Sequence, residues 1–205
     1  MAKWLSTLLL PLLFGCTGTT SYYHLSSGES WDQYRSGCAG PLNSYETRLD
    51  DGAKMHLYLN KKNSSTDLSF MFLIARGKTV KLSNNTIKIR ENTSKEERTI
   101  PIKEFISERD LGIYTLNANP SFREYQVERL VLGPTEVLNG LGRFSHNYRG
   151  ESPDDRYQAF LTLADKPLEE MVIEFPPIIV NGQTQSLGPL HFEYKSSSYF
   201  RACFQ

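Results

Sequence analysis

Residues 53–60 read AKMHLYLN and residues 68–75 read LSFMFLIA. In the first stretch every second residue from Met55 is apolar, a pattern typical of a strand that is buried on one face. The second stretch is apolar on both faces: Phe70, Phe72 and Ile74 on one, and Met71, Leu73 and Ala75 on the other. It therefore predicts a central strand covered on both sides.

Further strands are predicted by alternation and by turn residues along the chain. Pro101 removes a ladder donor and places its strand at a sheet edge, and Asn181-Gly182 is a strong hairpin signal. The polar stretch 91–97 is predicted to be a hairpin loop. The predicted strands are Thr79–Leu82, Thr86–Arg90, Arg98–Lys103, Gly112–Leu116, Arg156–Leu163, Met171–Phe175, Ile178–Val180, Leu190–Tyr194 and Tyr199–Phe204.

This spacing of short strands predicts an all-β fold, an antiparallel β-sandwich over residues 31–205. An immunoglobulin-like arrangement is the architecture we expect. Trp31 precedes Cys38, however, so the sequence lacks the Cys–Trp–Cys signature of immunoglobulin domains. Residues 121–132 remain open between two structures. Ser121 to Glu124 matches a helix capping box, whereas Tyr125 to Leu132 alternates like a strand, which we favour.

The N-terminus has the three parts of an export signal. Lys3 is basic, Trp4 to Phe14 carries no charge, and Gly15-Cys16 follows. The apolar stretch is shorter than the roughly 20 residues that span a bilayer. Residues 1–15 are therefore predicted to be a signal peptide.

The run Leu13-Phe14-Gly15-Cys16 resembles the lipobox of bacterial lipoproteins, although Phe14 departs from the usual small or aliphatic residue. This resemblance implies cleavage before Cys16, a diacylglyceryl group on its sulfur, and a fatty acid such as palmitate on its amino group. Acyl chains of this kind hold a protein on a membrane. Thr17 after the cysteine implies the outer membrane, facing the periplasm, with the inner membrane and the cell surface as alternatives. Residues 16–30, rich in Thr, Ser and Gly, are predicted to be a flexible tether with a reach of about 20 Å.

Charge and cysteine content narrow the functional classes. The 205 residues include 23 basic and 23 acidic side chains, so removal of Lys3 leaves a single negative charge in excess. A chain this close to neutrality lacks the basic patch of a nucleic-acid-binding protein. Apart from Cys16, the sequence contains two cysteines, Cys38 and Cys203. In an oxidising compartment they are predicted to form a disulfide, with two free thiols as the alternative.

The sequence contains no H-E-x-x-H, G-x-S-x-G or Walker motif, and Gly140-Leu141-Gly142 lacks the rest of a dinucleotide fingerprint. No catalytic residue, metal site or cofactor is predicted. The long connection from Gly133 to Asp155 is the candidate for partner binding, because aromatic residues and arginine are enriched in interface hot spots. The candidate residues are Arg143, Phe144, His146, Tyr148 and Arg149. The alternative is a crossover packed by its own aromatic side chains.

These observations favour a non-catalytic protein-binding or scaffold lipoprotein of the cell envelope. An immunity protein against a secreted toxin is one alternative. An envelope hydrolase acting on glycan or peptide is another, and it would need His146 beside Asp154 or Asp155 in one cleft.

Overall fold

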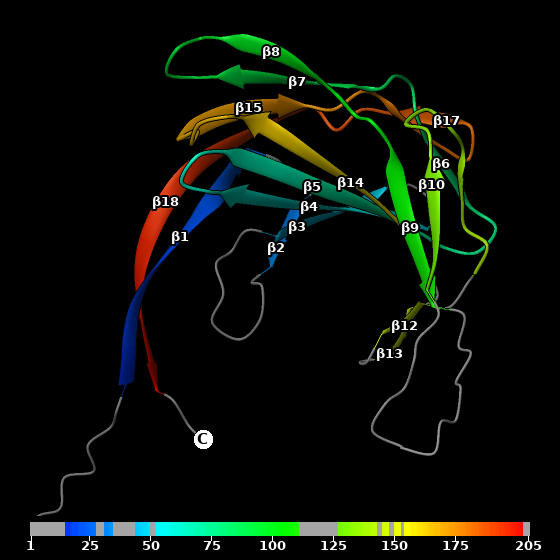
Figure 1. Ribbon diagram of the computed structural model, residues 1–205, viewed down its shortest axis with the longest axis horizontal. Coiled ribbons are helices and arrows are strands. Elements are labelled where there is room, and N and C mark those ends of the chain that lie inside the picture. The colour runs from blue at the N-terminus through cyan, green and yellow to red at the C-terminus, as the bar shows by residue number, and fades with distance from the viewer. Residues whose placement is uncertain are drawn as a thin grey trace, which may run out of the picture.

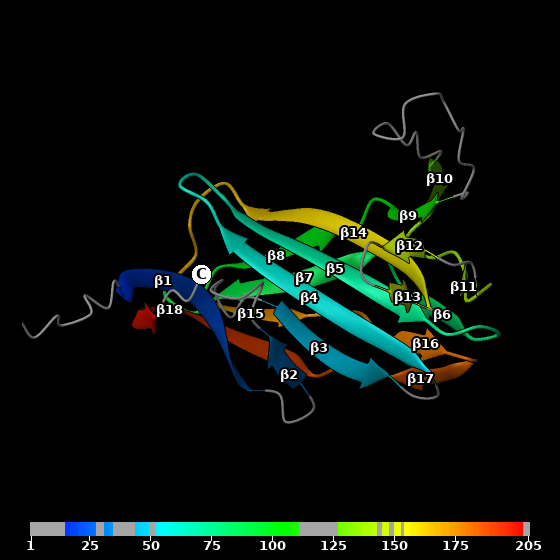
Figure 2. The ribbon, with the colours of Figure 1, turned by 90° about the horizontal axis from the view of Figure 1, so that it is seen from below.

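The computed structural model describes residues 15–27, 31–34, 44–49, 52–110, 127–142, 145–147, 150–152 and 154–202. These residues form strands, turns and connections without a helix, and every strand pair is antiparallel. Figures 1 and 2 show two sheets lying one above the other. The predicted antiparallel β-sandwich is therefore confirmed, and its immunoglobulin-like form stays a prediction.

One layer is a seven-stranded sheet with β5 at its centre. Its order is β10 (Val127–Leu132), β9 (Phe105–Asp110), β14 (Asp155–Ala164), β5 (Thr66–Ile74), β4 (Ala53–Lys61), β3 (Ser44–Leu49) and β2 (Trp31–Tyr34). The other layer is a five-stranded sheet. Its order is β1 (Gly15–Ser27), β18 (Pro189–Ala202), β15 (Glu170–Glu174), β7 (Thr86–Glu91) and β8 (Glu97–Pro101).

Two smaller units complete the described part of the chain. A four-stranded sheet has the order β11 (Leu138–Asn139), β6 (Thr79–Leu82), β16 (Ile178–Val180) and β17 (Gln183–Gln185). A separate hairpin joins β12 (Ser145–Asn147) and β13 (Gly150–Ser152). Asn181 and Gly182, which connect β16 to β17, have φ angles of 50° and 84°. Positive φ at both central residues defines the tight hairpin turn that the sequence predicted.

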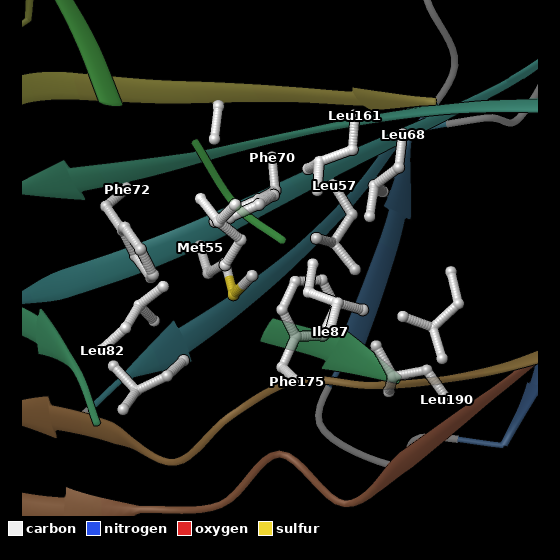
Figure 3. Close-up of a cluster of buried hydrophobic side chains, with 14 of the residues drawn as sticks. Met55, Leu57, Leu68, Phe70, Phe72, Leu82, Ile87, Leu161, Phe175 and Leu190 are labelled. Atoms are coloured by element: carbon white, nitrogen blue, oxygen red, sulfur yellow. The ribbon is translucent and has the colours of Figure 1, made fainter. Parts of the chain in front are cut away.

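The core lies between the two large sheets. The ring of Phe70 on β5 packs edge-on against Phe105 at 5.6 Å and against Phe175 at 5.3 Å between centroids. Tyr45 on β3 meets Phe192 on β18 at 5.3 Å, which joins the two layers. Figure 3 shows apolar side chains of both layers pointing into this space. Aromatic pairs in such edge-to-face geometry stabilise a core beyond the area they bury.

Strand β5 differs from its prediction on one face. Phe70 and Phe72 are fully buried, as expected of residues facing the second sheet. Met71 and Leu73, on the opposite face, are only partly buried. The expectation of two covered faces was therefore wrong: the outer side of this sheet is partly open to solvent.

The predicted edge strand is confirmed. β8 contains Pro101, ends the five-stranded sheet and pairs with β7 alone among the described strands. The polar residues between β7 and β8 form the expected hairpin loop, closed by a bond from the Glu91 amide to the Glu96 carbonyl.

Residues 15–27 are not a flexible coil. They form β1, which pairs with β18 from Gly15 opposite Ala202 to Ser27 opposite His191. The Tyr194 amide still donates to the Glu169 carbonyl at 2.7 Å. Beyond Tyr194, β18 pairs with β1 alone among the described strands, so the two strands continue as a ribbon with Cys16 opposite Arg201. Tyr23 fixes the base of this ribbon, since its hydroxyl donates to the Leu168 carbonyl at 2.8 Å. The serines that suggested a linker face serines of β18, and the hydroxyls of Ser21 and Ser196 lie 2.7 Å apart.

Several predictions fall outside the described residues. These are most of the signal peptide, Gly112–Leu116, the capping box at residues 121–124, and both Cys38 and Cys203. Of the ambiguous stretch 121–132, the described part is β10, and it is a strand.

Candidate functional site

The segment from Val131 to Gly142 leads from β10 into the connection that the sequence singled out. Val131, Val137 and Leu141 in this segment are 50%, 46% and 46% exposed. They are three of the five exposed large hydrophobic residues in the part of the chain that the structure describes. Because exposed apolar side chains that form a patch mark interaction sites, this segment is the candidate site of partner binding.

This segment is fixed to the body of the protein by its backbone. Leu138 is buried and pairs with Val80, so β11 becomes the edge of the four-stranded sheet. The Gly140 amide donates to the Lys78 carbonyl at 2.8 Å, and the Gly77 amide donates to the Gly140 carbonyl at 2.7 Å. A Cβ atom at Gly140 would lie 1.9 Å from the Ala75 carbonyl oxygen, so only glycine fits this close approach.

Asp155 closes the base of the connection. Its carboxylate accepts hydrogen bonds from the Leu141 amide and, at 2.8 Å, from the Gly142 amide. The Tyr157 hydroxyl donates to the Asn139 carbonyl at 2.7 Å and adds a second link between β14 and the same segment. Because Asp155 is only 6% exposed, removal of its carboxylate would leave amide donors unpaired near the core.

The predicted binding loop contains more structure than a long irregular connection. Its middle holds the β12–β13 hairpin, in which His146 pairs with Glu151. The backbone of His146 is thereby placed, whereas Arg143, Phe144, Tyr148 and Arg149 lie outside the described residues. The sequence reasoning missed Val131, Val137 and Leu141. The sequence could have marked them, because these apolar residues lie near Gly133-Pro134 and Gly140, where turns keep side chains out of a core.

A charged cluster lies on the outer face of the seven-stranded sheet. The Glu46 carboxylate lies 3.0 Å from the Lys54 ammonium and also contacts His56 Nε2. Burial lowers the pKa of His56 below its usual value, although the Glu46 carboxylate acts in the opposite direction. The contact with Glu46 links His56 on β4 to β3.

Two acidic side chains, Asp155 and Glu169, are engaged in structure. Asp155 holds the backbone of residues 141 and 142, and Glu169 lies 2.5 Å from the Lys61 ammonium. Among the residues that the structure describes, no group of three or more His, Cys, Asp and Glu side chains is arranged to hold a metal ion. The same residues include no helix long and apolar enough to cross a membrane.

No protein-family model matches the chain, and no curated protein and no solved structure is significantly similar to it. The arguments for function therefore rest on the residues and the geometry described above.

Proposed function

We propose that this chain is a lipid-anchored, non-catalytic binding module of a bacterial envelope, which holds a protein partner on the segment from Val131 to Gly142 and the β12–β13 hairpin. The observation that carries the proposal is the combination of exposed Val131, Val137 and Leu141 with a backbone pinned by Gly140 and Asp155. A surface held in one conformation loses little entropy on binding, which favours affinity.

Acylation of Cys16 would place the anchor at the tip of the β1–β18 ribbon. Cys16 lies seven positions before the buried Tyr23, so the ribbon holds the anchor about 23 Å from the point where β1 enters the core. A strand of this length replaces the flexible tether with a stiffer spacer of similar reach. The outer membrane, facing the periplasm, is the proposed location.

The Cys38–Cys203 disulfide belongs to the same proposal. Arg201 lies opposite Cys16 at the tip of the ribbon, so a bridge from Cys203, two residues further on, would tie the end of the ribbon to the connection between β2 and β3. Such a link would further restrict the direction in which the anchor leaves the domain. Alkylation of native and reduced protein, followed by peptide mass mapping, tests this pairing.

The experiment for the binding role uses paired variants at exposed apolar positions. Val137→Ser with Leu141→Ser removes apolar surface from the proposed interface, and Phe160→Ser removes it from β14, outside the Val131–Gly142 segment. Native envelopes solubilised in mild detergent should yield a stoichiometric protein with the wild type and with the Phe160 variant. The double variant should retain at most about a tenth of it, as expected from loss of interface hot spots. Recovery of the chain alone, or equal recovery with the double variant, would contradict the proposal.

A further inference from the structure

A groove runs along the outer face of the seven-stranded sheet, directly above β5. Its larger part is a hollow of about 360 Å³ lined by β4, β5 and β14, together with Lys62. A smaller hollow of about 110 Å³ adjoins it and shares Tyr58 and Ser69. Figure 2 shows this face of the sheet, with β14, β5 and β4 side by side. The larger hollow lies within the range of roughly 300–1,000 Å³ that small-molecule sites occupy.

The strand register explains the shape of this groove. Tyr58, Ser69 and Phe160 lie opposite one another on three adjacent strands. Strands are about 4.8 Å apart, so the Cα atoms of the two aromatic residues are separated by about 10 Å, with a small serine between them. Tyr58 is 38% exposed and Phe160 is 63% exposed. The groove therefore has an aromatic wall on each side and a low polar floor.

Polar side chains occupy the neighbouring row. Asn60, Asp67 and Thr162 lie opposite one another, two residues along the same strands, and all three line the larger hollow. An amide, a carboxylate and a hydroxyl together offer both donors and acceptors. Further along, Gln158 on β14 and Ser44 on β3 line the smaller hollow. The groove thus offers apolar walls and alternating hydrogen-bonding groups along one direction.

The charges around the groove balance one another. Lys62 and Asp67, the charged residues that line the larger hollow, lie 2.5 Å apart as an ion pair. His56 lines the smaller hollow and contacts the Glu46 carboxylate, and burial lowers the pKa of this histidine, which favours its neutral form. A ligand with a net charge would find no uncompensated partner among these residues. The lining therefore favours an uncharged ligand that both donates and accepts hydrogen bonds.

From this juxtaposition we infer that the groove binds a neutral oligosaccharide, with one pyranose ring between Tyr58 and Phe160. The C–H face of such a ring is apolar and lies flat against an aromatic side chain, while its hydroxyl groups both donate and accept. Asp67 to Met71 spans about 13 Å of strand along the groove floor, which suits a short chain of sugars rather than a single ring. None of the residues that line the two hollows belongs to the Val131–Gly142 segment, so the inference does not depend on the proposed protein partner.

The test measures binding of defined sugars to the processed protein in a zwitterionic detergent without a sugar headgroup. Maltotriose and N,N′,N″-triacetylchitotriose serve as neutral probes, and 3′-sialyllactose serves as a charged probe. Titration calorimetry and saturation-transfer NMR should detect at least one neutral trisaccharide at about 5 mM or below. Phe160→Ala should weaken this binding at least about tenfold, while Phe160→Tyr, which keeps the ring, should bind like the wild type.

The matched control is Val137→Ala, which removes exposed apolar surface outside the seven-stranded sheet and should leave sugar binding unchanged. The inference is overturned if neither neutral trisaccharide binds, if only 3′-sialyllactose binds, or if Phe160→Ala binds as well as the wild type. Because Phe160 is largely exposed, its variants are expected to fold, and an unchanged melting temperature confirms that loss of binding is local. Loss of the protein partner in the double variant described above would leave this result unaffected.

Discussion

The two faces of the seven-stranded sheet are made by alternate residues of the same strands, yet they have opposite character. On the inner face Leu57, Phe70 and Ala159 are at most 1% exposed and pack against the second sheet. On the outer face Tyr58 and Phe160, the next residues along β4 and β14, are exposed beside polar side chains. The difference shows that packing fixes one face, whereas the other is free to carry a ligand.

The largest expected difference between the two faces is in stability, and truncating one phenylalanine on each face measures it. Phe70→Ala should lower the free energy of unfolding by about 3–5 kcal/mol, because it opens a cavity beside Phe105 and Phe175. Phe160→Ala should change it by no more than about 0.5 kcal/mol. Urea denaturation of both variants measures the two values, and similar losses would contradict the assignment of inner and outer faces.

The loss of stability at alkaline pH should reveal the burial of Tyr23. Burial raises the pKa of Tyr23 to about 12, whereas an unfolded tyrosine titrates near pH 10. The stability contributed by the neutral hydroxyl is therefore complete below about pH 10 and lost as the pH rises toward 12, by roughly 2–3 kcal/mol. Tyr23→Phe should show a smaller loss between these pH values than the wild type does. Tyr58→Phe, on the outer face, is the control and should follow the wild type.

The neighbouring residues Asp154 and Asp155 test whether a buried carboxylate holds the base of the proposed partner site. Asp155→Ala should cost about 1–3 kcal/mol, because amides of Leu141 and Gly142 lose their acceptor. Amide hydrogen exchange at residues 141 and 142 should also accelerate. Asp154→Ala should cost no more than about 0.5 kcal/mol. Equal effects at the two positions would show that the carboxylate of Asp155 does not hold the segment.

The smallest effect concerns His56 on the outer face. Its pKa should lie below 6.5, and Glu46→Gln should lower it further, because the carboxylate favours the protonated ring. Stability linked to His56 is present above about pH 6.5 and decreases as the pH falls toward the folded pKa. NMR titration of the imidazole C–H signals measures both values. A pKa that rises in the variant would refute the opposing roles of burial and Glu46.

The sequence was a good guide to the inner face and a poor guide to the outer one. Alternation identified Met55, Leu57 and Phe70 as core residues, because burial of one face imposes a period of two on any strand. The groove could not be predicted, since Tyr58, Ser69 and Phe160 meet only through the register of three strands. Register depends on long-range pairing that no local pattern encodes.

Strand β1 shows a second limit of the sequence. Thr, Ser and Gly around residues 17–21 resemble a linker in composition, but their partner strand carries serines at positions 196–198 and pairs with them residue by residue. Composition alone does not distinguish a linker from an edge ribbon whose stability comes from its ladder. Tyr23 was the local signal of a strand, because a buried aromatic anchors the chain to the core.

The central claim is that this domain is held on a membrane through Cys16. Intact-mass and N-terminal peptide mass spectrometry of the protein from its native host tests it directly. We predict a chain that begins at Cys16 and carries a diacylglyceryl group, with a fatty acid on the amino group. A chain that retains residues 1–15, or one that begins at Cys16 with an unmodified sulfur, would contradict the claim.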